Sequence, residues 1–236
     1  MRDMNIKLFA DGACVKDMVR LRNKGIVSGF TTNPSLIKKS NVINYKAFAK
    51  SVLDEIPDMP ISFEVLSDDL DTMKKESLKI SSWGDNIYVK IPITNTLGIS
   101  TAPIIKDLSE NGIKLNITAI LTTNQVDVAV EALSKTTPSI ISVFAGRIAD
   151  TGIDPRYIVR LSHSKIMRFK NIELLWASTR EVLNILQAYE CGCSIITITP
   201  DILKKLPMLG KDLTELSLET VKQFHDDAIS AGYKII

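Results

Sequence analysis

The sequence predicts an α/β chain that folds as a (β/α)8 TIM barrel with an extra C-terminal helix, and three observations support this fold. Short apolar runs alternate with amphipathic segments from end to end and make about eight β/α units. The length of 236 residues is close to the ~250 typical of such a barrel. No low-complexity or Pro/Gly-rich linker interrupts the pattern, so we expect one domain over residues 1–236.

The predicted strands are short, apolar and rich in branched residues. They cover residues 6–11, 25–32, 60–67, 86–93, 113–121, 139–146, 172–179 and 193–200. The segments between them carry apolar residues at helical spacing, and they cover residues 15–25, 68–84, 101–112, 124–135, 154–170, 180–192 and 201–207. Gly25, Gly112 and Gly192 end three of these helices just before a strand, as is usual for helix C-caps. A further helix at roughly 211–233 follows the eight units.

An open, doubly wound sheet is the alternative fold, but no G-x-G-x-x-G motif follows any predicted strand. The charge is balanced at +2, so neither nucleic acid nor a membrane surface is an expected partner. No apolar run reaches the ~20 residues of a membrane span, and the first residues lack the apolar core of a signal peptide. We therefore expect a cytoplasmic protein.

Cysteine and histidine are too sparse to suggest a metal or redox centre. Cys191 and Cys193 resemble a short metal or redox motif, but no second Cys/His cluster accompanies them. Small residues at a helix end and a strand start are the favoured interpretation, with free thiols in a reducing compartment. His163 and His225 both fall in predicted helices, which disfavours a histidine-based triad. No metal and no cofactor is expected.

Polar side chains occur toward the C-terminal end of one predicted strand after another. In a barrel these ends form the mouth of the active site, whereas the interior is usually filled with branched apolar side chains. The candidates are Asp11, Thr31, Thr32, Asn33, Glu64, Lys90, Asn116, Thr118, Ser142, Arg147, Ser178 and Arg180, with Phe144 in register with Ser142. Buried polar groups cost several kcal/mol unless they are paired, so such a ring favours a functional site.

Each candidate also has a structural interpretation. Asp11 could cap a helix, and Asn33 before Pro34 could do the same. Glu64 could form an ion pair with Lys90 without any chemistry. The remaining alternatives are that Asn116 and Thr118 satisfy each other and that Arg147 and Arg180 are solvated. Unrelated structural roles should not all fall at the same end of successive strands, which favours the site.

Lys90 is the most unusual residue of the ring. The alternation of the strand places Lys90 and Tyr88 inside the barrel, with Ile87, Val89 and Ile91 facing the helices. Burial among apolar groups favours the neutral amine, which can attack a carbonyl carbon and form a Schiff base. The iminium is an electron sink that allows an adjacent carbon–carbon bond to break. None of these steps requires a metal.

The other residues can supply the rest of that chemistry. Asp11 can take the proton of a substrate hydroxyl, and Glu64 with Thr118 can serve the water that forms and breaks the imine. Asn33 and Asn116 can hold sugar hydroxyls. Arg147 and Arg180 supply two guanidinium groups, and Ser178 supplies a hydroxyl. Such a group of donors is expected to bind phosphate.

The chain resembles the transaldolase family of Schiff-base aldolases. The resemblance rests on six motifs that follow the family order and spacing from the first strand to the last: GFTTNPSL, SFEV, YVKIP, GIKLNITAI, SVFAGRIAD and WASTRE. It implies a barrel with Lys90 as the Schiff-base lysine, Asp11 as the acid/base for carbon–carbon cleavage, and Glu64 and Thr118 around a catalytic water.

The resemblance also implies the substrate contacts. Asn33, Asn116 and Ser142 are expected to bind the dihydroxyacetone portion, and Arg147, Ser178 and Arg180 the acceptor phosphate. Thr32 and Phe144 complete the expected substrate-binding set. Two departures from the family pattern are Gly12, where Ser or Thr often follows the aspartate, and Thr179, where the family usually has an aromatic residue.

The implied activity is that of a transaldolase in the pentose phosphate pathway. Such an enzyme moves a dihydroxyacetone unit from sedoheptulose 7-phosphate or fructose 6-phosphate to glyceraldehyde 3-phosphate or erythrose 4-phosphate. Glu64 and Phe144 favour this over a fructose 6-phosphate aldolase, which typically has Gln and Tyr there. That aldolase and a non-catalytic phosphosugar-binding barrel are the alternatives. The resemblance also implies a homo-oligomer, a pentamer or decamer.

Overall fold

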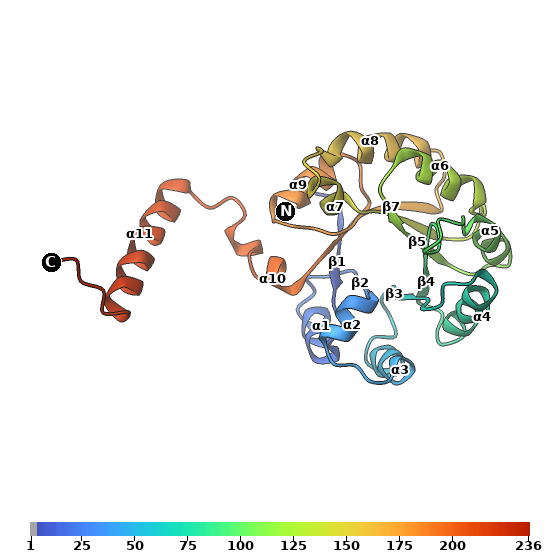
Figure 1. Cartoon of the computed structure of the whole chain (residues 1–236), viewed down its shortest axis with the longest axis horizontal. Coiled ribbons are helices and arrows are strands. Elements are labelled where there is room, and N and C mark those ends of the chain that lie inside the picture. The colour runs from blue at the N-terminus through green and yellow to red at the C-terminus, as the bar shows by residue number, and fades with distance from the viewer. Residues whose placement is uncertain (1–3) are drawn as a thin grey trace. The chain divides into compact units, whose positions relative to one another are not determined.

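The computed structural model describes residues 4–236 and contains a closed barrel of eight parallel strands (Figure 1). The strands follow one another around the barrel in chain order, and β1 pairs with β8 to close it. They are β1 Lys7–Asp11, β2 Gly29–Thr31, β3 Ile61–Glu64, β4 Ile87–Pro92, β5 Leu115–Ile120, β6 Ser139–Val143, β7 Ile172–Trp176 and β8 Ile195–Ile198. The predicted (β/α)8 fold is confirmed. Residues 1–3, at the start of the predicted domain, lie outside the described residues.

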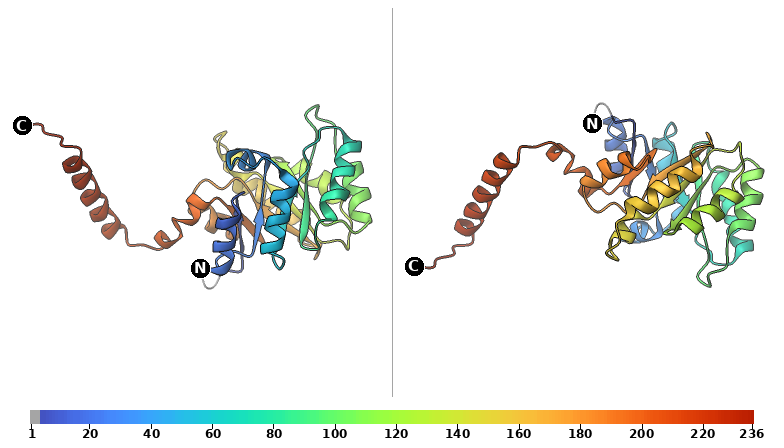
Figure 2. Two further views of the ribbon diagram at one scale, coloured as in Figure 1. Left: turned by 90° about the horizontal axis from the view of Figure 1, so that it is seen from below. Right: turned by 90° about the horizontal axis from the view of Figure 1, so that it is seen from above.

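Helices surround the strands on the outside of the barrel (Figures 1 and 2). They are α1 Val15–Asn23, α2 Pro34–Lys39, α3 Tyr45–Glu55, α4 Leu70–Ser81, α5 Ala102–Glu110, α6 Thr123–Ala132, α7 Ala145–Ala149, α8 Pro155–Ile166, α9 Leu183–Glu190 and α10 Pro200–Leu203. Local sequence explains several of their ends. For example, Thr122 and Gln125 form a capping box at the start of α6.

Three parts of the chain differ clearly from the prediction. The strand expected at 25–32 is confined to the three residues of β2, and the left-handed Gly25 instead closes the turn that ends α1. The strand expected at 139–146 ends at Val143, and the short helix α7 begins at Ala145. Helices α2 and α3, between β2 and β3, were not among the predicted segments.

The barrel interior contains an apolar cluster. Buried Phe9, Ile140, Leu175, Ala177 and Ile195 pack together there, with Tyr88 and Phe144 against them. Gly29 makes room for the Phe9 ring, since a Cβ at that position would lie 2.6 Å from it. Because Phe9 points inward, this contact also shows that Gly29 faces the barrel interior.

The alternation predicted for β4 agrees with this packing. Tyr88 packs against the interior cluster. Ile87, Val89 and Ile91 are also buried, and they alternate along the strand with Tyr88 and Lys90. Lys90 therefore lies on the interior face of β4, where the strand holds it rigidly.

Residues 204–236 group into a second compact unit, whereas the residues up to Leu203 form the barrel unit. The second unit contains a 3-10 turn, Leu206–Met208, and the helix α11 Leu213–Ser230, which matches the helix expected at roughly 211–233. Asp212 caps α11 by accepting hydrogen bonds from the backbone of Thr214 and Glu215. Among residues 4–236, no helix is both long and apolar enough to span a bilayer.

Candidate active site

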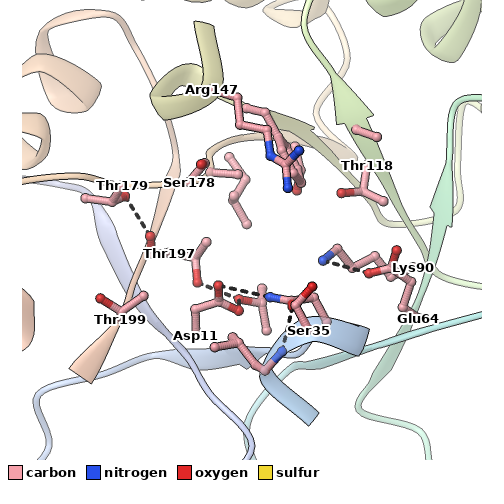
Figure 3. Close-up of a pocket in the computed structure, with 18 of the residues that line it drawn as sticks. Asp11, Ser35, Glu64, Lys90, Thr118, Arg147, Ser178, Thr179, Thr197 and Thr199 are labelled. Atoms are coloured by element: carbon pink, nitrogen blue, oxygen red, sulfur yellow. Dashed lines mark hydrogen bonds and ion pairs between the residues drawn. The ribbon is translucent and has the colours of Figure 1, made fainter. Parts of the chain in front are cut away.

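A cavity of about 530 Å³ opens at the C-terminal ends of the strands (Figure 3). Residues on all eight strands, or on the turns that follow them, line it. Eleven of the thirteen candidate residues are among these: Asp11, Thr31, Asn33, Glu64, Lys90, Thr118, Ser142, Phe144, Arg147, Ser178 and Arg180. The two that are not are Thr32 and Asn116, both of which are fully buried.

The amine of Lys90 lies close to two oxygen atoms, one on the neighbouring strand β3 and one on the residue that follows β2. Lys90 is only 5% exposed. Its Nζ lies 3.1 Å from Oε2 of Glu64 and donates a hydrogen bond of 3.0 Å to the carbonyl oxygen of Thr32. Glu64 and Lys90 are directly paired in register across β3 and β4, so the backbone itself brings the carboxylate to the amine. Figure 3 shows the two side chains together at one side of the cavity.

Asp11 at the end of β1 points into the same cavity and is held by two neighbours from the β2 segment. Thr31 donates a hydrogen bond of 2.9 Å to its Oδ1, and the amide of Asn33 lies 3.4 Å from its Oδ2. Thr31 Oγ1 also lies 2.5 Å from the hydroxyl of Thr197 on β8. The alternative role of Asp11 as a cap of α1 is not realised, since Cys14 occupies that position.

Burial raises the pKa of Asp11 above its ordinary value. The positive charge of Lys90 and the hydrogen bond from Thr31 act in the opposite direction but do not cancel the effect of burial. A raised pKa makes the carboxylate a stronger base for a substrate proton, which suits an acid/base role.

Of the two threonine candidates at the end of β2, Thr31 faces the cavity and Thr32, which was expected to bind substrate, does not. Thr32 points away, and its hydroxyl donates to the carbonyl oxygen of Ser62. The sequence contained a usable signal, because a strand alternates and the inward Gly29 places Thr31 on the same face. Thr197 was missed, although it lies within the predicted strand at 193–200.

Asn116 has a structural position beneath the cavity. Its amide nitrogen donates to Ser62 Oγ at 2.9 Å, and its oxygen accepts from Ser142 Oγ at 2.7 Å. It therefore links β3, β5 and β6, and of these three polar residues Ser142 alone reaches the cavity wall. The suggested pairing of Asn116 with Thr118 does not occur.

The hydroxyl of Thr118 is buried and has no hydrogen-bond partner among residues 4–236. The adjacent Ala119 has a left-handed backbone, with a φ of 58°, and the pairing of β5 with β6 shifts register between Ile117 and Ile120. Such a bulge redirects side chains at the end of a strand. An unpaired hydroxyl on the cavity wall is suited to holding a water or a substrate hydroxyl.

The guanidinium groups and Ser178 form another part of the cavity wall. Arg147 extends from α7, its guanidinium 5.7 Å from the ring centre of Phe144 (Figure 3). Arg180 forms a two-point ion pair with Asp150, and this hydrogen bonding holds the pKa of Asp150 below its usual range. Both partners of that pair are about half exposed, so solvent screens it.

Backbone geometry fixes Ser178. Its φ is 63°, an uncommon value for a residue other than glycine. Gly146 on α7 packs directly against it, since a Cβ on Gly146 would lie 1.6 Å from the carbonyl oxygen of Ser178. Strained backbone of this kind is often found at functional sites.

Thr179, which departs from the family pattern, and the two neighbouring cysteines all have buried positions in the structure. Thr179 is buried, and its hydroxyl donates to the carbonyl oxygen of Thr197 at 2.7 Å, which ties β7 to β8. Cys191 and Cys193 are buried free thiols. The described part of the chain contains no group of three His, Cys, Asp or Glu residues that could hold a metal ion.

A smaller cavity of about 300 Å³ adjoins Arg180 and is lined by Trp176, Asn184 and Gln187 among others. Trp176 is almost completely buried, and its indole nitrogen has no hydrogen-bond partner within the described residues.

Comparison with known proteins gives matches over nearly the whole chain. A curated relative in Thermoanaerobacter sp. (strain X514), named probable transaldolase, is 34% identical and covers 98% of this chain and 100% of its own. A second probable transaldolase, from Nitrosopumilus maritimus (strain SCM1), is 31% identical over 91% of this chain and 92% of its own.

Solved structures show the same fold at low sequence identity. The structure of 2,3-dimethylmalate lyase superposes with a TM-score of 0.58 at 10% identity, covering 100% of this chain and 86% of that one. The structure of 3-hexulose-6-phosphate synthase from Salmonella typhimurium gives 0.56 at 13% identity, covering 82% and 89%. The family model described as Transaldolase/Fructose-6-phosphate aldolase matches residues 8–235. The chain therefore belongs to the transaldolase/fructose-6-phosphate aldolase family.

Proposed function

We propose that this protein is a transaldolase that transfers a dihydroxyacetone unit between sugar phosphates through a Schiff base on Lys90. The observation that carries the proposal is the buried amine of Lys90, which is in contact with the Glu64 carboxylate at 3.1 Å and lines a cavity shared with Asp11. Family membership supports this class of chemistry. We propose sedoheptulose 7-phosphate or fructose 6-phosphate as donor, and glyceraldehyde 3-phosphate or erythrose 4-phosphate as acceptor, in the pentose phosphate pathway.

The reaction begins when the Lys90 amine, having passed a proton to the adjacent Glu64 carboxylate, attacks the ketone carbon of the donor. The carbinolamine loses water, and the product is an iminium ion. Asp11 then takes the proton from the C4 hydroxyl, the C3–C4 bond breaks, and its electron pair moves into the iminium to give an enamine. The aldose phosphate leaves with the new aldehyde.

Transfer is completed by the same steps in reverse. The enamine carbon attacks the aldehyde carbon of the acceptor, and Asp11 returns its proton to the new alkoxide. Water then hydrolyses the iminium and frees the product ketose and the Lys90 amine. Only an acid/base able to gain and lose a proton can serve both directions, and the raised pKa of Asp11 supports that role.

Glu64 and Thr118 are placed to serve the water steps. The Glu64 carboxylate is close enough to Lys90 to exchange a proton with it, and the unpaired Thr118 hydroxyl can hold the departing or attacking water. We assign the sugar hydroxyls to Asn33 and Ser142 on the cavity wall. Asn116 acts by orienting Ser142.

We assign the phosphate to the wall formed by Arg147, Ser178 and Arg180. Guanidinium groups bind phosphate through paired N–H donors. The exposed pair of Arg180 with Asp150 keeps that guanidinium at the cavity without burying it.

Covalent trapping tests the Schiff base. Borohydride added with fructose 6-phosphate should leave a reduced adduct on the peptide that contains Lys90, and Lys90→Met should abolish it. Lys165→Met, a lysine paired with Asp127 away from the cavity, is the matched control and should trap normally. A folded, unmodified wild-type protein would contradict the mechanism and favour a non-catalytic sugar-phosphate-binding barrel.

Dependence on an acceptor distinguishes transaldolase from aldolase. We expect the cleavage of fructose 6-phosphate to proceed past one turnover only when erythrose 4-phosphate is present. Glu64 and Phe144 support this outcome. Sustained release of free dihydroxyacetone without acceptor would assign the protein to the aldolase branch of the family.

We also propose that the protein is cytoplasmic, since its three cysteines are free thiols, and that it assembles into a homo-oligomer such as a pentamer or decamer. Sedimentation velocity measures the assembly directly.

A further inference from the structure

We infer that Tyr45, the first residue of α3, is a positioning residue that holds Glu64 against the Lys90 amine. The inference rests on the proposed Schiff-base function, because it concerns the proton transfers that accompany the imine. Tyr45 does not line the cavity, and no step described so far uses it.

The Tyr45 hydroxyl makes two hydrogen bonds to one residue. It donates to the backbone carbonyl oxygen of Glu64 at 2.9 Å and accepts from the backbone N–H of Glu64 at 2.9 Å. A single side-chain oxygen therefore satisfies both backbone groups at the point where β3 enters the site.

The strand pattern explains why a side chain is needed there. The carbonyl oxygens of Pro60 and Ser62 accept hydrogen bonds from β2, so alternate residues of β3 turn their backbone groups toward that strand. Glu64 is the next in this series. The last paired residue of β2 is Thr31, opposite Ser62, and the chain then turns into α2 at Pro34. The Tyr45 hydroxyl replaces the missing strand partner of Glu64.

The ring of Tyr45 is fixed by aromatic neighbours. It packs edge-on against Phe63 and Trp83, with ring centres 6.2 Å apart in each case. Asn44 caps the helix that begins at Tyr45, which fixes the backbone of the tyrosine as well. Burial raises the pKa of the hydroxyl above its ordinary value, so it stays protonated and can donate and accept at once.

This clamp controls the surroundings of the Lys90 amine. The two oxygen atoms near Nζ belong to Glu64 and Thr32, and Thr32 is itself tied to β3 through Ser62. Loss of the hydroxyl would leave a backbone N–H and C=O of Glu64 unpaired, which is unfavourable for buried polar groups. The end of β3 would then shift, and the carboxylate would leave its position beside the amine.

The test is a double-mutant cycle between Tyr45→Phe and Glu64→Gln. Each rate is divided by the concentration of protein that forms the borohydride-reduced adduct, so that only active protein is counted. Tyr45→Phe keeps the ring and removes the hydroxyl. We expect it to lower kcat by about tenfold, in line with the sensitivity of catalysis to sub-ångström misplacement. KM for the donor should change less than about twofold, because the residues that bind the substrate lie on other strands.

In the Glu64→Gln background the effect of Tyr45→Phe should fall below about threefold, because residues that act through one another are non-additive. Tyr88→Phe, which removes a hydroxyl from the barrel interior, is the control and should leave kcat unchanged. An equal loss in both backgrounds, a change confined to KM, no change at all, or a Tyr45→Phe chain that does not fold would each overturn the inference. If the wild type forms no adduct on Lys90, the proposed function fails instead.

Discussion

At the scale of single residues, the proton affinity of Asp11 depends on the hydroxyl of Thr31. The Thr31 hydrogen bond favours the ionised carboxylate and so opposes the rise in pKa that burial causes. The hydroxyl of Thr197, 2.5 Å from Thr31 Oγ1, completes a short chain of polar groups from β8 to β1. Among residues 4–236, neither threonine forms a hydrogen bond with Lys90, so both can be changed while its bonds to Thr32 and Glu64 remain.

Thr31→Val should therefore raise the pKa of Asp11 further. Because Asp11 must be ionised to accept the hydroxyl proton, a higher pKa reduces its active fraction at low pH, and the acid limb of the kcat profile moves to higher pH. A hydrogen bond to a charged group is worth ~1.5 kcal/mol, which corresponds to a rate about tenfold lower at the acid end. The rate at high pH should change much less.

The pH dependence of transfer measures this effect, and Thr197→Val is the matched control. That variant leaves the Thr31–Asp11 bond in place, so its acid limb should move less than that of Thr31→Val. An unchanged acid limb in Thr31→Val would show that Asp11 does not titrate in the rate-limiting step.

The site residues that could best be predicted from the sequence were charged residues in otherwise apolar strands, where a purely structural role is hard to justify. Lys90, Glu64 and Asp11 are charged side chains within predicted strands, and each lies on the cavity. Thr32 and Asn116 could not be separated from true lining residues, because short polar side chains serve equally well inside the wall. Tyr45 was beyond prediction, since its role depends on where β2 ends in space.

At the scale of secondary-structure elements, the junction of α7 with the end of β7 determines the shape of the arginine wall. Gly146 allows the α7 backbone to approach Ser178, whose left-handed conformation aims the following residues toward the cavity. Arg147 is adjacent to this contact in sequence, and Arg180 lies two residues after Ser178.

Gly146→Ala should disturb this junction. The added methyl group would lie 1.6 Å from the Ser178 carbonyl oxygen, so one backbone must move. We expect a loss of ~1–3 kcal/mol in the free energy of unfolding, as for other overpacked sites, and a higher KM for phosphorylated acceptors. Urea unfolding and steady-state kinetics measure the two effects.

Gly152→Ala serves as the control within the same segment. Gly152 has a φ of 81° and open space around it, so alanine there adds backbone strain without any contact. Stability should fall by ~1 kcal/mol with KM unchanged. If both variants change KM equally, general loosening rather than the contact with Ser178 would be responsible.

Helix and strand periodicity predicted most elements of the barrel but not their functional ends. The strand expected through residue 146 stops at Val143, because Ala145–Ala149 is a run of good helix formers around a glycine needed for close packing. Between β2 and β3 the chain forms α2 and α3. The cap at Asn33 was recognised as an alternative in the sequence, yet the helix it begins was not assigned.

At the scale of the whole molecule, the barrel unit contains every residue that we assign to chemistry. The unit beyond residue 203 differs in having several large apolar side chains exposed on one helix. Helix α11 exposes Leu213, Leu218, Val221, Phe224 and Ile229. A continuous set of exposed apolar side chains on one helix usually marks an interface between proteins.

Replacing Leu218 and Phe224 together by glutamate should reduce the assembly to smaller species, since charge on a buried interface is costly. Sedimentation velocity should show a larger species for the wild type than for the variant. The matched change Lys222→Glu, which introduces glutamate at an exposed polar position of the same helix, should leave the distribution as it is. A wild type that sediments as a monomer would contradict the proposed assembly.

The packing of Trp83 on Tyr45 also means that intrinsic tryptophan fluorescence can report on this part of the site. The sequence holds two tryptophans: Trp83 lies beside Tyr45, and Trp176 lines the smaller cavity that adjoins Arg180. Indole emission responds to the polarity and mobility of its surroundings. Retaining one tryptophan at a time would let stopped-flow fluorescence follow each side of the site separately, without an attached dye.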